Sequence, residues 1–269
     1  MAKPPNEHAL DGFERSSFSA EGQTHDVYRA GSGPAVIVIH EVPGITPLVA
    51  AFGRNVAAAG FTAVLPNLFG SAGEEMTVPY ALRSMLHGCV SREFTMFATA
   101  KTSPITKYLR ALATHEHAAC GGPGVGAVGM CLTGGFALAM SVDEVMLAPV
   151  LSQPSMPMPV SKSRRRDLGI SDADLKVVKK RVDDGLCVMG LRFTGDKAAP
   201  AERFARLRSE LGDNFIGVEI DSSEGNPWGY RKGAHSVLTE DYSDAEGSPT
   251  RKAFEDLLNF FTSRLKAAS

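Results

Sequence analysis

The alternation of short, β-branched apolar runs with longer amphipathic segments constrains the fold of this chain more than any other feature. This pattern is typical of a mostly parallel sheet with helices on both faces, and it predicts a doubly wound α/β fold. The expected strands are HDVYRA (25–30), AVIVIH (35–40), FTAVLP (61–66), VGAVGM (125–130), EVMLAP (144–149), LCVMGLRF (186–193) and FIGVEI (215–220). The expected helices cover 47–60, 105–118, 171–184, 200–211 and 249–266, with one more after Cys131.

Two irregular stretches interrupt this alternation, at 70–103 and 150–171. The chain has 269 residues and is 43% hydrophobic, which is enough for one large core, and no long Pro/Gly/Ser-rich linker divides it. We therefore expect a single domain over 1–269 with two insertions above the sheet. Such insertions often contact substrate, since the scaffold itself needs only short connections. The SKSRRR run in the second insertion is interpreted as a solvated loop.

The charge pattern argues for small-molecule chemistry. The formal net charge is −2 and the pI is about 6.4, so no broad basic surface for nucleic acid is expected. No apolar stretch approaches the roughly 20 residues that span a bilayer, and the start of the sequence does not resemble a secretory signal. A cytoplasmic protein without membrane contact is expected. The oligomeric state stays open.

The cysteines do not form a recognisable framework. They lie far apart and lack C-x-x-C pairs, which argues against both a disulfide scaffold and a zinc site. We expect no metal and no organic cofactor. The four positions are Cys89, Cys120, Cys131 and Cys187.

Cys131 occupies the most informative position of the four. It follows an expected strand directly and precedes the small residues LTGGFALAM. A nucleophile elbow needs this context, because its sharp turn tolerates only small neighbours. A structural cysteine packed against the next helix is the alternative, and this stretch alone leaves both interpretations open.

Two polar residues downstream favour the nucleophile. Asp196 follows the expected strand 186–193, and His235 lies in the long loop after the strand 215–220. Nucleophile, acid and base then occur in the chain order of the α/β-hydrolase fold. Singly, Asp196 could be a helix cap and His235 a surface loop residue.

The loop after the expected strand 35–40 reads EVPGI. In this fold that loop supplies one backbone N–H of the oxyanion hole, and the residue after the nucleophile supplies the other. These would be the amides of Val42 and Leu132. Glu41 stands beside them and is expected to reach the thiol, although it could equally be an ordinary polar loop residue.

Five stretches carry a resemblance to a known family. VIVIHEVPGI, AVLPNLF, VGMCLTGGFALAM, GDKAAP and GAHSV look like the dienelactone hydrolases, in the same order over nearly the whole chain from about residue 20. The resemblance implies a Cys-His-Asp triad of Cys131, His235 and Asp196, with Glu41 holding the resting thiol near neutral. It implies a hydrolase of small esters or lactones.

Two departures from the family pattern stand out. The elbow usually reads G-x-C-x-G-G, and here Thr133 is inserted before the glycine pair. Dienelactone hydrolases also place an arginine just after the catalytic histidine to bind the substrate carboxylate, where this chain has Thr239 and Glu240. This difference argues against the acidic dienelactone as substrate.

Four further residues are candidate substrate contacts. Arg83 or Arg92 in the first insertion could supply a cation, and exposed helix arginines are the alternative interpretation. Trp228 and Tyr230 could wall an apolar acyl pocket or merely pack their long loop. Two competing functions also remain: a catalytically silent binding protein of this fold, and a redox-sensing thiol protein that would need Cys120 or Cys187 nearby.

Overall fold

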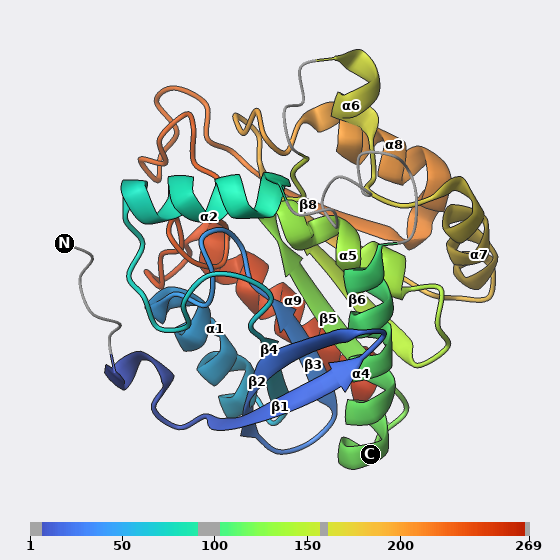
Figure 1. Ribbon diagram of the computed structural model, residues 1–269. Helices are drawn as coiled ribbons and strands as arrows, with labels where there is room; N and C mark the ends of the chain where they lie inside the picture. Colours follow the sequence, from blue (N-terminus) through green and yellow to red (C-terminus); the bar gives the residue numbers. More distant parts are fainter. Residues whose placement is uncertain (1–6, 91–102, 157–160, 267–269) are drawn as a thin grey trace.

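The computed structural model describes residues 7–90, 103–156 and 161–266. Its centre is an eight-stranded sheet with the order β1-β2-β4-β3-β5-β6-β7-β8 (Figure 1). The first two strands run antiparallel to their neighbours, and all later pairs are parallel. The strands are β1 (Glu14–Ala20), β2 (Gln23–Gly31), β3 (Ala35–Ile39), β4 (Thr62–Pro66), β5 (Val125–Met130), β6 (Met146–Ser152), β7 (Val188–Phe193) and β8 (Phe215–Ile220).

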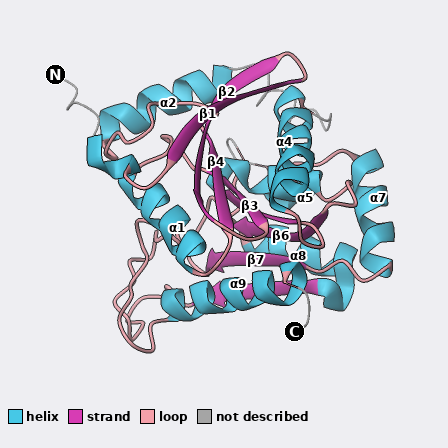
Figure 2. Ribbon diagram, turned by 90° about the horizontal axis from the view of Figure 1, so that it is seen from below, coloured by secondary structure: helices cyan, strands magenta, loops and turns pink. Residues whose placement is uncertain are grey.

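The helices cover both faces of this sheet, so the predicted α/β architecture is confirmed. Apolar side chains of α1 and α9 pack on one face, and those of α4, α5, α7 and α8 pack on the other. Figure 2 shows α1 and α9 together on one side, with α4, α5 and α7 opposite them. The helices are α1 (Pro47–Ala58), α2 (Val78–Val90), α4 (Pro104–Cys120), α5 (Gly134–Met140), α6 (Lys162–Arg166), α7 (Asp172–Asp183), α8 (Ala201–Leu211) and α9 (Pro249–Leu265), and the short 3-10 turns are Glu7–Leu10, Cys131–Thr133 and Gly212–Asn214.

The central strands are buried along their whole length. Every residue of β3, β4 and β5 is buried, as expected for parallel strands that helices cover on both faces. Their continuous apolar composition therefore follows from their place in the sheet. None of the helices described is both long and apolar enough to cross a bilayer.

Four elements differ from the sequence-based expectation. The edge strand β1 was not expected, because most of its residues are exposed and its sequence ERSSFSA has no strong apolar pattern. Strand β6 extends to Ser152 and so takes the start of the second expected insertion. The first insertion contains α2. The SKSRRR run forms the short helix α6, where Arg165 pairs with Glu202 at 2.8 Å.

The parallel strands bring several loops to one edge of the sheet. The segment after β3 begins with His40 and Glu41, and those after β5 and β6 begin with Cys131 and Gln153. The turn after β7 leads to Asp196. The loop between β8 and α9, here called the histidine loop (residues 221–248), begins at the same edge. Residues far apart in sequence meet there.

Candidate active site

The turn at Cys131 has the geometry of a nucleophile elbow. Cys131 has a φ of 55°, a left-handed conformation that is costly for a residue with a side chain. A Cβ on Gly129 would stand 2.3 Å from the carbonyl oxygen of Thr133, so the chain must have glycine where the turn folds back on the strand. The tight turn leaves the Cys131 side chain partly exposed at the end of β5.

Thr133, the departure from the family pattern, fits this turn and holds it. Its side chain is fully buried, and its hydroxyl accepts a hydrogen bond from the Met130 N–H at 2.9 Å. The same oxygen lies 2.9 Å from the carbonyl oxygen of Ile39 at the end of β3. Threonine therefore ties the elbow to the neighbouring strand, a contact that glycine could not make.

His235 and Asp196 lie side by side. The Nδ1 atom of His235 is 2.6 Å from Asp196 Oδ2, and Asp196 is buried. The other carboxylate oxygen of Asp196 accepts a hydrogen bond from the Ala198 N–H at 2.8 Å. The acid is thus fixed on both sides, and the second ring nitrogen of His235 is left for another partner.

Cys131 lies close enough to His235 for the two side chains to interact and for this interaction to raise the pKa of the imidazole. Burial lowers the pKa of His235, but the Cys131 sulfur and the Asp196 carboxylate outweigh burial and raise this pKa to about 11. Burial raises the pKa of Asp196, but its hydrogen bond and charge interaction with His235 and the amides of Ala198 and Ala199 together lower it. At neutral pH the His235 ring is therefore protonated, and the Asp196 carboxylate stabilises its charge.

A second aspartate holds the backbone around the histidine. Asp241 accepts hydrogen bonds from the backbone N–H groups of His235 at 2.7 Å and Ser236 at 3.1 Å. Its other oxygen pairs with Arg231 at 3.1 Å. The sequence reasoning missed this residue, although its place a few residues after the histidine could have indicated a loop support.

Glu41 is buried beside the site, but its hydrogen bonds differ from the expected contact with the thiol. Ser236 donates to its Oε2 atom at 2.8 Å, and Gln153 donates to the same oxygen at 3.2 Å. The Thr239 hydroxyl donates to Oε1. The hydroxyl groups of Ser236 and Thr239 thus donate to both oxygens of the Glu41 carboxylate. These bonds join the loop after β3 to the histidine loop.

Gln153 is a further residue that sequence reasoning missed. It directly follows β6, is fully buried and has a strained φ of 36°. Its backbone N–H donates to Leu191 at 2.7 Å, and its side chain bonds Ser152 as well as Glu41. Its place at the carboxyl end of a parallel strand was the signal that could have found it.

The two expected oxyanion amides lie at the same edge. Val42 follows Glu41 in the loop after β3, and Leu132 directly follows Cys131 in the 3-10 turn Cys131–Thr133. Both residues are partly exposed. Their positions along the chain are those from which this fold directs two backbone N–H groups at an oxyanion.

The expected substrate contacts have different positions. Tyr230 packs its ring on Phe193, with centroids 5.0 Å apart, and its hydroxyl lies 3.0 Å from Ser248 Oγ, so it supports the histidine loop. Trp228 is 43% exposed. Arg83, on α2, lies 3.6 Å from Glu74 and stacks over Tyr80. Arg92 falls outside the described residues.

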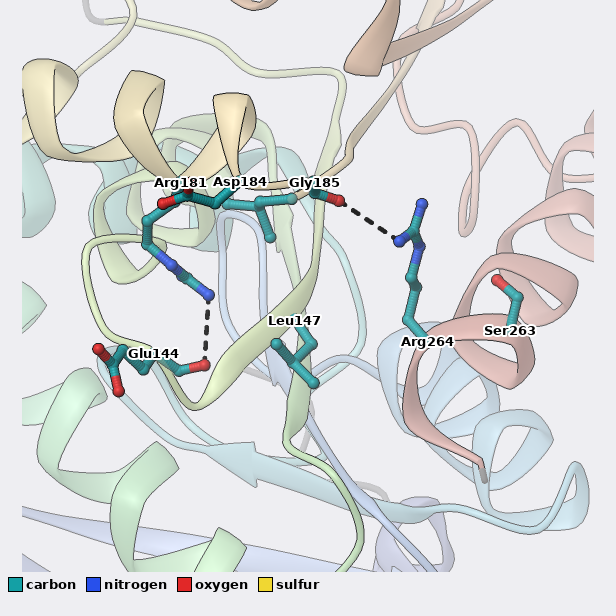
Figure 3. Close-up of a pocket in the computed structure, with 8 residues that line it drawn as sticks. Glu144, Leu147, Arg181, Asp184, Gly185, Ser263 and Arg264 are labelled. Carbon is teal, nitrogen blue, oxygen red and sulfur yellow. Dashed lines mark hydrogen bonds between the residues drawn. The ribbon is translucent and has the colours of Figure 1, made fainter. Parts of the chain in front are cut away.

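A separate pocket of about 470 Å³ lies at the opposite edge of the sheet, where β6 and β7 begin (Figure 3). Arg181 and Arg264 line it, and Figure 3 shows them donating to the backbone carbonyls of Glu144 and Gly185. These arginines hold loop backbone in place. Nowhere in 7–90, 103–156 or 161–266 do three or more His, Cys, Asp or Glu side chains gather as a metal would require.

The fold defines a class, the α/β-hydrolase fold, and Cys131 stands in the sharp turn directly after β5. A family model, the dienelactone hydrolase family, matches residues 25–265. The chain therefore belongs to the dienelactone hydrolase family, which is a family of hydrolases.

Solved structures agree with this assignment at the level of fold. A Klebsiella pneumoniae protein assigned as a dienelactone hydrolase is 16% identical with a TM-score of 0.64, and the match covers 93% of this chain and 98% of that one. A dienelactone hydrolase from Anabaena variabilis is 16% identical over 94% and 98% of the two chains, with a TM-score of 0.61. A dienelactone hydrolase-like promiscuous phosphotriesterase from metagenomic libraries is 13% identical over 94% and 98%, with a TM-score of 0.60. No curated protein matches the sequence.

Proposed function

We propose that this protein is a cysteine-dependent hydrolase of small esters or lactones, with Cys131 as nucleophile, His235 as acid and base, and Asp196 as the residue that orients the imidazole. One observation carries the proposal: Cys131, in its left-handed turn, interacts with His235, whose Nδ1 lies 2.6 Å from Asp196. This is the arrangement that an activated thiol nucleophile requires.

The first half of the reaction transfers the acyl group to the enzyme. The Cys131 thiolate attacks the carbonyl carbon, and a C–S bond forms while the carbonyl π electrons move to oxygen. The amides of Val42 and Leu132 stabilise this oxyanion. The C–O bond to the leaving group then breaks, and His235 gives its proton to the departing oxygen. In a lactone the leaving oxygen stays attached to the acyl chain.

Water completes the turnover. His235, now neutral, takes a proton from a water molecule that attacks the thioester carbonyl. The C–S bond breaks, the carboxylic acid leaves, and the thiolate–imidazolium pair is restored. Asp196 keeps Nδ1 protonated throughout, so the other ring nitrogen, Nε2, gives the proton in the first step and takes it in the second.

Glu41 takes part as a positioning residue in this proposal. Its carboxylate joins the loop that carries Val42 to the histidine loop through Ser236 and Thr239. It thereby fixes the position of the Val42 amide relative to His235. Replacing Glu41 with Gln should lower kcat more than it raises KM, because ground-state binding does not depend on this alignment.

The decisive experiment compares the hydrolysis of 4-nitrophenyl acetate by the wild type, Cys131→Ser and Cys131→Ala. Turnover that is lost in both variants supports the proposal, and equal rates in all three proteins contradict it. If the wild type shows no turnover, the rate of Cys131 alkylation by iodoacetamide in wild type and His235→Gln distinguishes an activated thiol from a silent binding protein. Faster alkylation in the wild type indicates activation.

A further inference from the structure

Arg203, in the first turn of α8, is a buried cation that takes no part in the steps described above. Its side chain is 2% exposed, although arginine is almost never fully buried without partners. Burial lowers the pKa of Arg203 to about 10, and the charges of Asp167 and Asp196 oppose this effect. The guanidinium therefore stays charged at neutral pH, and the protein must supply acceptors for its N–H groups.

Four backbone carbonyls accept hydrogen bonds from this guanidinium. Its Nη1 atom donates to the carbonyl oxygens of Pro154 and Ala198, the latter at 3.2 Å. Its Nε atom donates to the carbonyl of Asp167 at 2.6 Å, and Nη2 donates to that of Arg164 at 3.1 Å. These bonds join three segments that are far apart in sequence: the segment after β6, the end of α6 with the turn that follows it, and the turn after β7.

The bond to Pro154 reaches the turn of Cys131. Ser155, the next residue, donates its N–H to the Cys131 carbonyl oxygen at 2.9 Å. Pro154 also packs on the start of α5, where a Cβ on Gly134 would stand 2.8 Å from Pro154 Cα. Both Pro154 and Ser155 are buried. Arg203 thus fixes a segment that contacts the nucleophile elbow at two points.

The bond to Ala198 reaches the turn that carries Asp196. The Ala198 N–H donates to Asp196 Oδ1 at 2.8 Å. A second buried arginine, Arg192 on β7, donates to the carbonyl oxygens of Thr194 at 3.0 Å and Ala199 at 2.7 Å. Arg192 thus holds the turn to its own strand, whereas Arg203 ties the turn to the segment that contacts the nucleophile elbow.

We propose, building on the hydrolase function above, that Arg203 is a positioning residue that fixes the turn of Asp196 relative to the turn of Cys131. One nitrogen atom, Nη1, donates to a carbonyl on each side, so the two sides of the site are joined at a single point. The placement matters because Asp196 orients the His235 ring, and the reaction needs this ring and the Cys131 sulfur in a fixed relation. Arg203 is itself buried and acts through these residues.

The test measures kcat and KM for 4-nitrophenyl acetate in the wild type, Arg203→Met and Arg203→Lys. Methionine donates no hydrogen bond, whereas lysine keeps the charge and places its donors on one nitrogen. We expect kcat to fall by roughly ten- to hundredfold in Arg203→Met and by a smaller factor in Arg203→Lys, with KM changed by less than about twofold, because misplaced catalytic groups slow the chemical step. Arg206→Met is the matched control, since Arg206 lies on the same helix and donates to the Arg166 carbonyl at the end of α6 at 3.3 Å. It should keep the wild-type kcat.

A second comparison separates positioning from a merely structural role. If Arg203 acts through Asp196, its loss costs little once Asp196 no longer orients the imidazole, so Asp196→Asn/Arg203→Met should have a kcat within about twofold of Asp196→Asn alone. A destabilised fold would instead lower activity by the same factor with and without Asp196. That equal loss, or an unchanged kcat in every Arg203 variant that folds, overturns the proposal. If circular dichroism shows that Arg203→Met does not fold, Arg203→Lys takes its place in both comparisons.

Failure of the hydrolase function itself is recognised separately, because the wild type would then turn over the ester no faster than Cys131→Ala. In that case the proton between His235 Nδ1 and Asp196 is followed by 1H NMR, where a short hydrogen bond to a carboxylate gives a far-downfield signal that Asp196→Asn removes. A signal that shifts or broadens in Arg203→Met but not in Arg206→Met supports the positioning role. The wild-type signal in both variants refutes it.

Discussion

Two different aspartates hold His235 in place. Asp196 holds its ring at Nδ1, whereas Asp241 holds its backbone N–H. The ring and the main chain are therefore fixed by different carboxylates. Changes at the two aspartates should separate orientation of the imidazole from placement of the loop.

Replacing Asp196 with Asn tests the orientation of the imidazole. An amide can donate to Nδ1 and so favour the wrong tautomer, and it removes the charge that supports the imidazolium. We expect kcat/KM for 4-nitrophenyl acetate to fall by roughly 100-fold or more. Asp183→Asn, an exposed residue in the last turn of α7, is the matched control and should retain the wild-type rate. A comparable loss in both variants would rule out a specific role for Asp196.

The same carboxylate predicts how stability depends on pH. The pKa of Asp196 in the folded protein lies below its ordinary value, so the unfolded chain takes up the proton first as the pH falls. The stabilisation is therefore fully present above about pH 4, the ordinary pKa of Asp, and disappears as the pH falls through the folded-state pKa. Urea unfolding of wild type and Asp196→Asn between pH 3 and 6 should show their stability difference shrinking toward acid. A constant difference would contradict this linkage.

Thr133 allows a prediction about the elbow. Thr133→Val keeps the shape but removes the oxygen that accepts from Met130 and approaches Ile39, leaving a buried N–H without its partner. We expect a loss of about 1–3 kcal/mol in the free energy of unfolding. Thr114→Val is a matched control, because the Thr114 hydroxyl bonds only a carbonyl on the exposed face of α4. Equal losses in the two variants would show that the buried position of Thr133 does not matter.

The sequence identified the residues that chain order and local motif reveal, and it missed those that depend on distant contacts. Cys131, Asp196 and His235 each follow a strand, so their meeting at one edge was predictable. The partners of Glu41 were not, because Ser236 and Thr239 lie almost two hundred positions away and only the finished fold brings them together. Glu41 was accordingly expected to contact the thiol.

Among the elements, the loop after β7 and the histidine loop are held together by the close approach of Gly195 to the Lys232 carbonyl. A methyl group on Gly195 would collide with the Lys232 carbonyl, and backbone cannot move aside as a flexible side chain can. Gly195→Ala should therefore separate Asp196 from His235 and lower kcat/KM by roughly tenfold or more, equivalent to at least about 1.4 kcal/mol, while the circular dichroism spectrum stays that of the wild type.

Gly233→Ala provides the comparison for this loop prediction. A Cβ there meets nothing within 4 Å, and Gly233 does not have a positive φ. The added methyl group should cost much less activity than it does at Gly195. Losses of the same size at both positions would mean that the close approach is not what fixes the pair.

The elements also show where sequence patterns fail. The buried strands β3, β4 and β5 begin and end within one residue of expectation, because their apolar runs are long enough to be seen directly. Strand β1 has little buried surface to leave an apolar pattern, and it is recognised only through its pairing with β2. The end of β6 was misplaced because SQP reads as a loop, whereas Ser152 still pairs with β7.

At the scale of the whole molecule, the parallel sheet separates Cys131 from the other cysteines whose side chains are described. Cys131 follows the carboxyl end of β5, whereas Cys187 precedes β7 and Cys120 ends the helix before β5. A strand of six residues such as β5 spans about 20 Å. A disulfide needs Cα atoms within roughly 7 Å of each other. Neither Cys120 nor Cys187 can therefore serve as a resolving cysteine for Cys131 in the folded protein.

This separation gives a test of the redox-sensor hypothesis. Under mild peroxide the native protein should form no disulfide between Cys131 and either of those two cysteines, and Cys131 should instead accumulate as a trapped sulfenic acid. Peptide mapping by mass spectrometry with dimedone labelling measures both products. Unfolding in urea before oxidation is the control, because it removes the separation and should allow the disulfides to form. A Cys131–Cys187 disulfide in the native protein would require the two edges of the sheet to meet and would make redox sensing the better explanation for the position of Cys131.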